Sequence, residues 1–179
     1  MRRMIPFLIA LICFILIILE GTFALNLLPF IPEDWMLANH FMFMFLLYVA
    51  IFFEKPHTYY AIILAIIFGL IVDIVYTNVI GVYIFSYTAV IYMVRVIMKF
   101  LQSNFLIAMS MTFLGVLTAD LMIFFVYQLI QLHNMNWDLY WQNRLLPTII
   151  GNIIIGLLLY SLFAKRLEKW SKIKFDQSE

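Results

Sequence analysis

Long apolar runs separated by short polar breaks dominate the hydropathy pattern of the chain. A helix needs about 20 mostly apolar residues to cross a bilayer, and prolines, charges and polar clusters mark where such helices end. The pattern therefore predicts an all-α integral membrane protein with a six-span domain over residues 1–164 and a basic tail over residues 165–179. The six transmembrane helices are expected at residues 4–28, 35–53, 58–76, 79–96, 104–132 and 145–164.

Composition supports this fold class. Of the 179 residues, 66% are hydrophobic and only 12% are charged, so too few polar residues are present to coat a soluble core of that size. The N-terminal apolar run is long for a signal peptide and no good small-x-small cleavage site follows it, so we expect a retained first span. The single cysteine, Cys13, excludes an intrachain disulfide framework.

The positive residues are distributed unevenly over the predicted loops. Membrane proteins carry an excess of Lys and Arg in their cytoplasmic loops. Of the eleven basic residues, only Arg144 lies on one side of the predicted topology. The other ten share the opposite side, which predicts a multi-pass membrane protein with both termini in the cytoplasm: Arg2, Arg3, Lys55, Arg95, Lys99, Lys165, Arg166, Lys169, Lys172 and Lys174.

Four polar residues lie deep in separate predicted spans: Glu20, Asp73, Asp120 and Asn152. At 1.5 Å of rise per residue, the three carboxylates lie roughly 22 to 24 Å from the cytoplasmic start of their spans, and Asn152 reaches a similar depth. Such groups either line a cavity or partner-binding face, or they reach interfacial water and bond neighbouring helices. Arg144, the only basic residue on the outer side, is a possible partner for one carboxylate.

Small side chains recur every four residues in the third predicted span. Ala61, Ala65, Gly69 and Asp73 form one narrow stripe on a helix, and such a stripe lets two helices pack closely in a membrane. A second stripe in the fifth span has its small residues at Ala108, Thr112, Gly115 and Ala119. Internal packing or a docking face for another membrane protein would each explain these stripes.

Catalytic and metal-binding patterns are absent from the sequence. His40 and His133 belong to the outer side and His57 to the inner side, so the three histidines cannot share one metal ion. No HExxH, CxxC, P-loop or GxSxG motif is present. The basic residues are spread along juxtamembrane positions without a stacking platform for bases. We therefore expect no enzyme, no metal, no cofactor and no nucleic-acid partner.

The segment Gly69-Leu70-Ile71-Val72-Asp73-Ile74, followed by Gly81-Val82-Tyr83, resembles the rod shape-determining protein MreD family. The resemblance extends to the size and the six-span layout, and it implies a location in the bacterial cytoplasmic membrane. It implies a non-enzymatic component of the bacterial cell-elongation machinery, which binds the bitopic protein MreC and works with actin-like MreB and the peptidoglycan synthases. Gly69, Asp73 and Gly81 are the matching motif positions. Residues 74–80 are bulkier than the turn expected of the family.

That family is in turn similar to the substrate-binding subunits of energy-coupling-factor vitamin transporters, which implies their six-helix fold and an alternative function. In that alternative, the polar residues of the outer half would form a pocket for a small molecule. The favoured hypothesis is a scaffold in the lipid bilayer. In this hypothesis the third and fourth spans form a hairpin, and the stripe with Asp73 shapes a face for an MreC-like partner.

Overall fold

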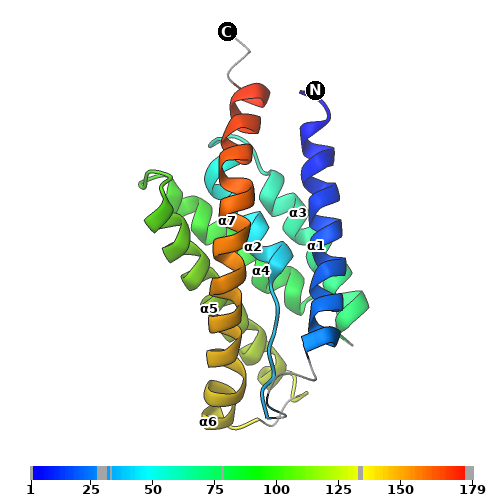
Figure 1. Ribbon diagram of the computed structural model, residues 1–179. Helices are drawn as coiled ribbons and strands as arrows, with labels where there is room; N and C mark the ends of the chain where they lie inside the picture. The colour runs from blue at the N-terminus through cyan, green and yellow to red at the C-terminus, as the bar shows by residue number, and fades with distance from the viewer. Residues whose placement is uncertain (1, 28–31, 33, 78, 133–134, 176–179) are drawn as a thin grey trace.

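The computed structural model describes residues 2–27, 32, 34–77, 79–132 and 135–175, and within these residues it contains helices and no strand. Figure 1 shows them as one elongated bundle. In chain order the helices are α1 (Ile5–Leu27), α2 (Phe41–Tyr48), η2 (Val49–Phe53), α3 (Tyr60–Tyr76), α4 (Val82–Met98), α5 (Phe105–Leu129), α6 (Trp137–Tyr140), η3 (Trp141–Leu145) and α7 (Leu146–Phe175).

The core of the bundle is built around α2 and η2. All thirteen residues of this segment are buried, and α2 contacts α1, α3, α4, α5 and α7. A helix that is apolar on every side has no face to present to water and is stable when neighbouring helices enclose it. On α5, the stripe around Gly115 packs here, because a Cβ at Gly115 would lie 2.7 Å from the Leu47 side chain.

The predicted second span is wrong over its first part. Residues 35–40 are not helical, and the helix begins at Phe41. The Ala38 carbonyl accepts a hydrogen bond of 2.7 Å from Asn152 Nδ2, and the His40 N–H donates one of 2.8 Å to Asn152 Oδ1. The Asn152 side chain of α7 thus bonds backbone groups of this segment that would otherwise form hydrogen bonds within a helix. Irregular backbone is tolerated near a membrane interior where protein encloses it.

Three helices of the described chain are long and apolar enough to cross a membrane: α1, α5 and the continuous helix formed by α6, η3 and α7. The helices Phe41–Phe53, Tyr60–Tyr76 and Val82–Met98 are apolar but shorter. The protein is therefore an all-helical membrane protein. The six-span topology remains a prediction for the three shorter helices.

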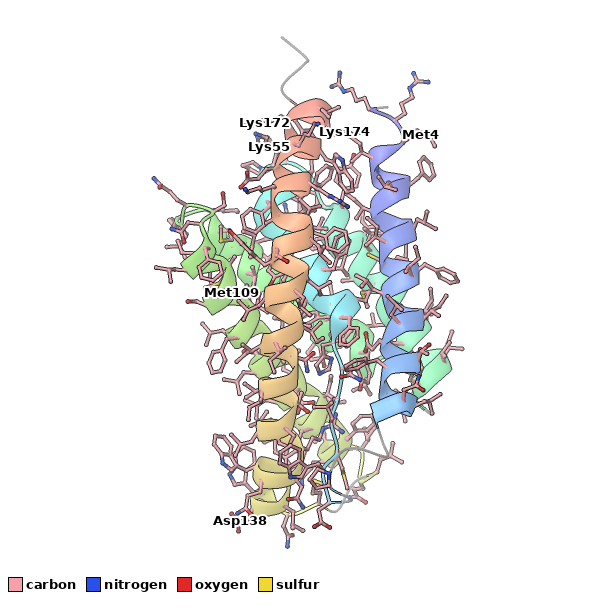
Figure 2. All side chains as sticks on the ribbon, viewed as in Figure 1. Met4, Lys55, Met109, Asp138, Lys172 and Lys174 are labelled. Carbon is pink, nitrogen blue, oxygen red and sulfur yellow. The ribbon has the colours of Figure 1, made fainter. Side chains whose placement is uncertain are left out.

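The first and last described residues of the chain lie at one end of the bundle. Arg2 Nε donates a 2.8 Å hydrogen bond to the Lys174 carbonyl near the start of α1 and the end of α7 (Figure 1). In Figure 2, Lys55, Lys172 and Lys174 lie at this end, and Asp138 lies at the opposite end. α7 runs without a break past residue 164, so the described part of the basic tail continues the last helix.

Candidate functional site

Asp73 joins the end of α3 to the start of α4. Its carboxylate accepts hydrogen bonds from the backbone N–H groups of Gly81 at 2.8 Å, Tyr83 at 2.9 Å and Ile84 at 3.3 Å. The first N–H groups of a helix have no partner within the helix and carry its positive dipole end. Asp73 is completely buried, so its charge is stabilised by the N-terminus of α4.

The small-residue stripe packs α3 against its neighbours. Ala61 and Ala65 are completely buried, and a Cβ on Gly69 would lie 2.9 Å from the Ile84 Cα. Gly81 has a φ of +113°, which residues other than glycine rarely adopt, and it precedes α4. The motif residues therefore build the α3–α4 hairpin. Ala61, Ala65, Gly69 and Asp73 are enclosed by this chain, and a role in partner binding remains a prediction.

Glu20 and Glu54 repeat the arrangement of Asp73. The N-cap residues of α2 and α3 make no side-chain capping bond of their own. Glu54 Oε1 instead accepts a 2.7 Å hydrogen bond from the Ala61 N–H, and the Glu20 carboxyl group faces the N–H groups of Phe41 and Met42. Each of these three acidic residues thus caps the helix that follows it in the chain.

Asp120 differs from these three residues, because basic and hydroxyl side chains hold it in place of a helix start. Its Oδ1 lies 3.0 Å from Arg144 Nη2 and 3.2 Å from Arg144 Nε, and its Oδ2 accepts a 2.6 Å hydrogen bond from the Tyr140 hydroxyl. Asp120 is completely buried. The ion pair joins α5 to η3, and Tyr140 stacks on Phe124 of α5 at 3.8 Å between ring centroids. The sequence alone does not indicate which carboxylate Arg144 contacts, and in the structure it lies against Asp120.

His40 connects this ion pair to Asn152. Its Nε2 lies 3.8 Å from Asp120 Oδ1, its Nδ1 lies 2.8 Å from the Tyr87 hydroxyl, and its backbone N–H bonds Asn152. The structure therefore groups Asp120, Arg144 and Asn152 around one buried histidine. Glu20 and Asp73 are held separately at helix starts. His133 lies outside the described residues.

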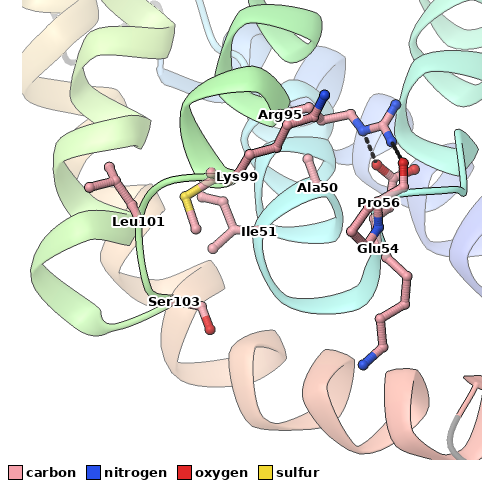
Figure 3. A pocket seen from close by; sticks show the side chains of 10 residues that line it. Ala50, Ile51, Glu54, Pro56, Arg95, Lys99, Leu101 and Ser103 are labelled. Atoms are coloured by element: carbon pink, nitrogen blue, oxygen red, sulfur yellow. Dashed lines mark hydrogen bonds and ion pairs between the residues drawn. The ribbon is translucent and has the colours of Figure 1, made fainter.

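A second polar site lies at the basic end of the bundle. Arg95 Nε is 2.8 Å from Glu54 Oε2, and its guanidinium also donates to the Pro56 carbonyl (Figure 3). It donates to the Thr58 carbonyl as well. Burial raises the pKa of Glu54 to about 7, against the smaller opposing effects of the Ala61 N–H and of Arg95. A cavity of about 210 Å³ adjoins the pair, with Lys55 and Lys99 in its lining.

The buried polar residues described above form hydrogen bonds and ion pairs that hold the helices together. The deep carboxylates are engaged by backbone N–H groups or by Arg144. Sequence reasoning missed Glu54, His40 and Tyr140, which hold the same networks. The signal for Glu54 was an acidic residue four positions before the predicted helix start at residue 58, whereas Asp73 lies inside α3 and nine positions before the start of α4.

The family model for rod shape-determining protein MreD matches residues 1–170, nearly the whole chain. The chain belongs to the MreD family. It is 30% identical over 144 residues to the rod shape-determining protein MreD of Bacillus subtilis strain 168, covering 79% of this chain and 82% of that protein. No solved structure matches, so the expected similarity to energy-coupling-factor subunits has no support from known folds.

The structure shows what each residue of the glycine and aspartate motif does in this member of the MreD family. Gly69 permits the close approach of α3 and α4, Gly81 takes the positive φ before α4, and Asp73 caps α4. The match and the apolar helices together make this a rod shape-determining membrane protein.

Proposed function

We propose that the protein is a non-enzymatic scaffold of the cell-elongation machinery, which binds an MreC-like bitopic membrane protein and acts with MreB and the peptidoglycan synthases. The observation that carries this proposal is the MreD family match over residues 1–170. The multi-pass topology, with both termini in the cytoplasm, is part of the proposal and is supported by the clustering of basic residues at one end of the bundle (Figure 2).

The engagement of the deep polar residues supports a scaffold over a solute carrier or an enzyme. Asp73, Asp120 and Asn152 are each buried and bonded to groups of the same chain. A carrier that binds its solute through these groups would have to break bonds that hold its helices together. We infer that these residues fix the shape of the bundle and that partner binding uses its surface.

The outer surface of the α3–α4 hairpin offers a face for a partner's helix. A groove of about 540 Å³ lies there, and its nearly apolar lining consists of Ile62, Ile66, Gly81, Ile84, Phe85, Thr88, Ala89 and Tyr92. Thr88 Oγ1 is buried and has no hydrogen-bond partner among the described residues. Small residues allow close approach of helices in a membrane, and a hydroxyl group can bond across the contact. We therefore place the hypothetical MreC-like contact on this groove.

Affinity recovery from bacterial membranes in mild detergent, followed by mass spectrometry, tests the proposal. The tagged wild type should recover an MreC-like bitopic protein together with cell-wall synthases. Ala89→Leu fills the groove and should lose them, whereas Ser161→Leu adds equal bulk to the exposed face of α7 and should retain them. Recovery of ATP-binding-cassette subunits in place of cell-wall proteins would instead favour the vitamin-transporter alternative.

A further inference from the structure

A cavity of about 510 Å³ lies between α1, α3 and the extended segment before α2. Its walls are mostly apolar, and its polar lining includes Glu20, Thr22, Asn39, Tyr76 and Tyr83. Volumes of about 300 to 1,000 Å³ with apolar walls and a few polar groups are typical of small-molecule sites. Neither the hairpin groove nor the Asp120 ion pair contributes to this cavity.

Two of the polar side chains retain bonding capacity toward a ligand. Asn39 Nδ2 is buried and has no hydrogen-bond partner in the part of the chain that is described. A buried donor without a partner is costly, so an acceptor at this position would be stabilising. Glu20 faces two backbone N–H groups, and a carboxylate with two oxygens can accept further bonds. By contrast, the hydroxyl groups of Thr22 and Tyr76 donate to the carbonyls of Ile18 and Ile17.

The charge of the lining selects the ligand. Among the described residues that line the cavity, Glu20 is the only one with an ionisable carboxyl group, and none is basic. A carboxyl group is negative or neutral and never positive, so an anionic group alone is disfavoured and a cationic donor is favoured. The best complement therefore carries an ammonium group for Glu20 and a neighbouring acceptor for Asn39. A phosphoethanolamine headgroup combines both features.

The cavity opens toward the surface that the bilayer covers. Three of its wall residues, Ile18, Leu25 and Tyr76, are 51%, 71% and 47% exposed. Glu20 precedes the end of α1 by seven residues, which places it about 10 Å below that end. Acyl chains could therefore lie along the apolar wall while the headgroup reaches Glu20. We propose that this cavity binds a lipid with a phosphoethanolamine headgroup.

Lipid-dependent thermal unfolding of the purified protein tests the proposal. Phosphatidylethanolamine should raise the Tm by about 2 to 4 °C more than phosphatidylcholine, which has no N–H donor, or phosphatidylglycerol, which has no cation. Asn39→Leu and Glu20→Gln should abolish this difference. Because Glu20 also faces the start of α2, Ala24→Phe provides a variant that fills the cavity and leaves both polar groups intact. Ser161→Leu is the matched control.

Native mass spectrometry of the same proteins should show one retained phosphatidylethanolamine that Ala24→Phe excludes. Equal stabilisation by the three lipids, or a preference that survives both Ala24→Phe and Asn39→Leu, would overturn the proposal. Loss of the partner protein in Ala24→Phe, without any lipid preference in the wild type, would also overturn it by assigning the cavity to a protein side chain. The partner is absent from the lipid measurement, so failure here leaves the proposed scaffold function standing.

Discussion

The Asp73 carboxylate accepts a 2.8 Å hydrogen bond from the Gly81 N–H across the turn between α3 and α4. One residue on each side of the turn thus fixes how the two helices meet. The contact explains why an acidic side chain can be completely buried in an apolar bundle, because N–H donors at the start of α4 replace the hydrogen bonds that water would otherwise donate.

Replacing Asp73 tests the strength of this cap. Asp73→Ala removes the acceptor for three backbone N–H groups and should lower the free energy of unfolding by about 2 kcal/mol. Asp73→Asn keeps one carbonyl oxygen and should cost less. Thermal unfolding in detergent measures both effects, and an unchanged Tm in the alanine variant would refute the capping role.

Substitutions at the two motif glycines should destabilise the protein for different reasons. Gly69→Leu should cost about 1 to 3 kcal/mol, because the new side chain meets the backbone of Ile84. Gly81→Ala meets no atom within 4 Å, yet its φ of +113° should cost about 1 kcal/mol. Chemical denaturation compares the two variants. If Gly69→Leu were as stable as the wild type, α3 and α4 would pack less closely at this position than the structure shows.

Removing one partner of the buried ion pair should lower the stability of the protein more than removing both partners. Arg144→Gln leaves the Asp120 charge buried without its ion-pair partner and should destabilise the bundle by about 3 kcal/mol. Adding Asp120→Asn removes that charge and should recover part of the loss. A double-mutant cycle of unfolding free energies measures the coupling. Strictly additive losses would argue against a direct interaction between these two residues.

Stability should depend on pH through Glu54. Because its pKa in the folded protein is about 7, above the ordinary value of 4.5, the folded state binds a proton more tightly than the unfolded state. The resulting stabilisation is complete below about pH 4.5 and is lost as the pH rises through 7. Relative to Glu54→Gln, the wild type should therefore lose Tm between pH 5 and pH 8.

A Tm that rises with pH would mean that the carboxylate form of Glu54 is favoured in the folded protein. If the wild type gains Tm over Glu54→Gln as the pH rises, attraction by Arg95 outweighs the burial of the carboxylate. Measuring Arg95→Gln over the same pH range separates the two effects, because this variant retains the Ala61 N–H bond to Glu54 and loses the guanidinium.

Hydropathy predicts most of the helices, because the backbone N–H and C=O groups of an apolar run in a membrane must bond one another, as they do in a helix. It fails at residues 35–40 because Asn152 and Thr148, more than a hundred residues later, bond that backbone. No local pattern reports such a contact. The predicted last span ends at residue 164, and the helix itself continues beyond it to Phe175, where the Ser171 hydroxyl donates a 2.8 Å hydrogen bond to the Phe53 carbonyl.

Depth in the predicted spans identifies Glu20, Asp73, Asp120 and Asn152 as unusual, but depth alone does not give their partners. A carboxylate that caps the next helix and one that pairs with Arg144 look alike in a hydropathy profile. The small-residue stripe likewise predicts close packing without saying what packs there. In the structure the start of α4 occupies the position at Gly69 that a partner would need.

Site-specific photocrosslinking in living bacteria tests most directly whether a partner uses the hairpin groove. A photoreactive residue is placed at Phe85 in the groove or at Leu157 on the exposed face of α7. We expect Phe85 to capture an MreC-like bitopic protein and Leu157 to capture none. Capture from Leu157 alone, or from neither position in cells where the protein supports rod shape, would contradict a scaffold that binds its partner through the α3–α4 hairpin.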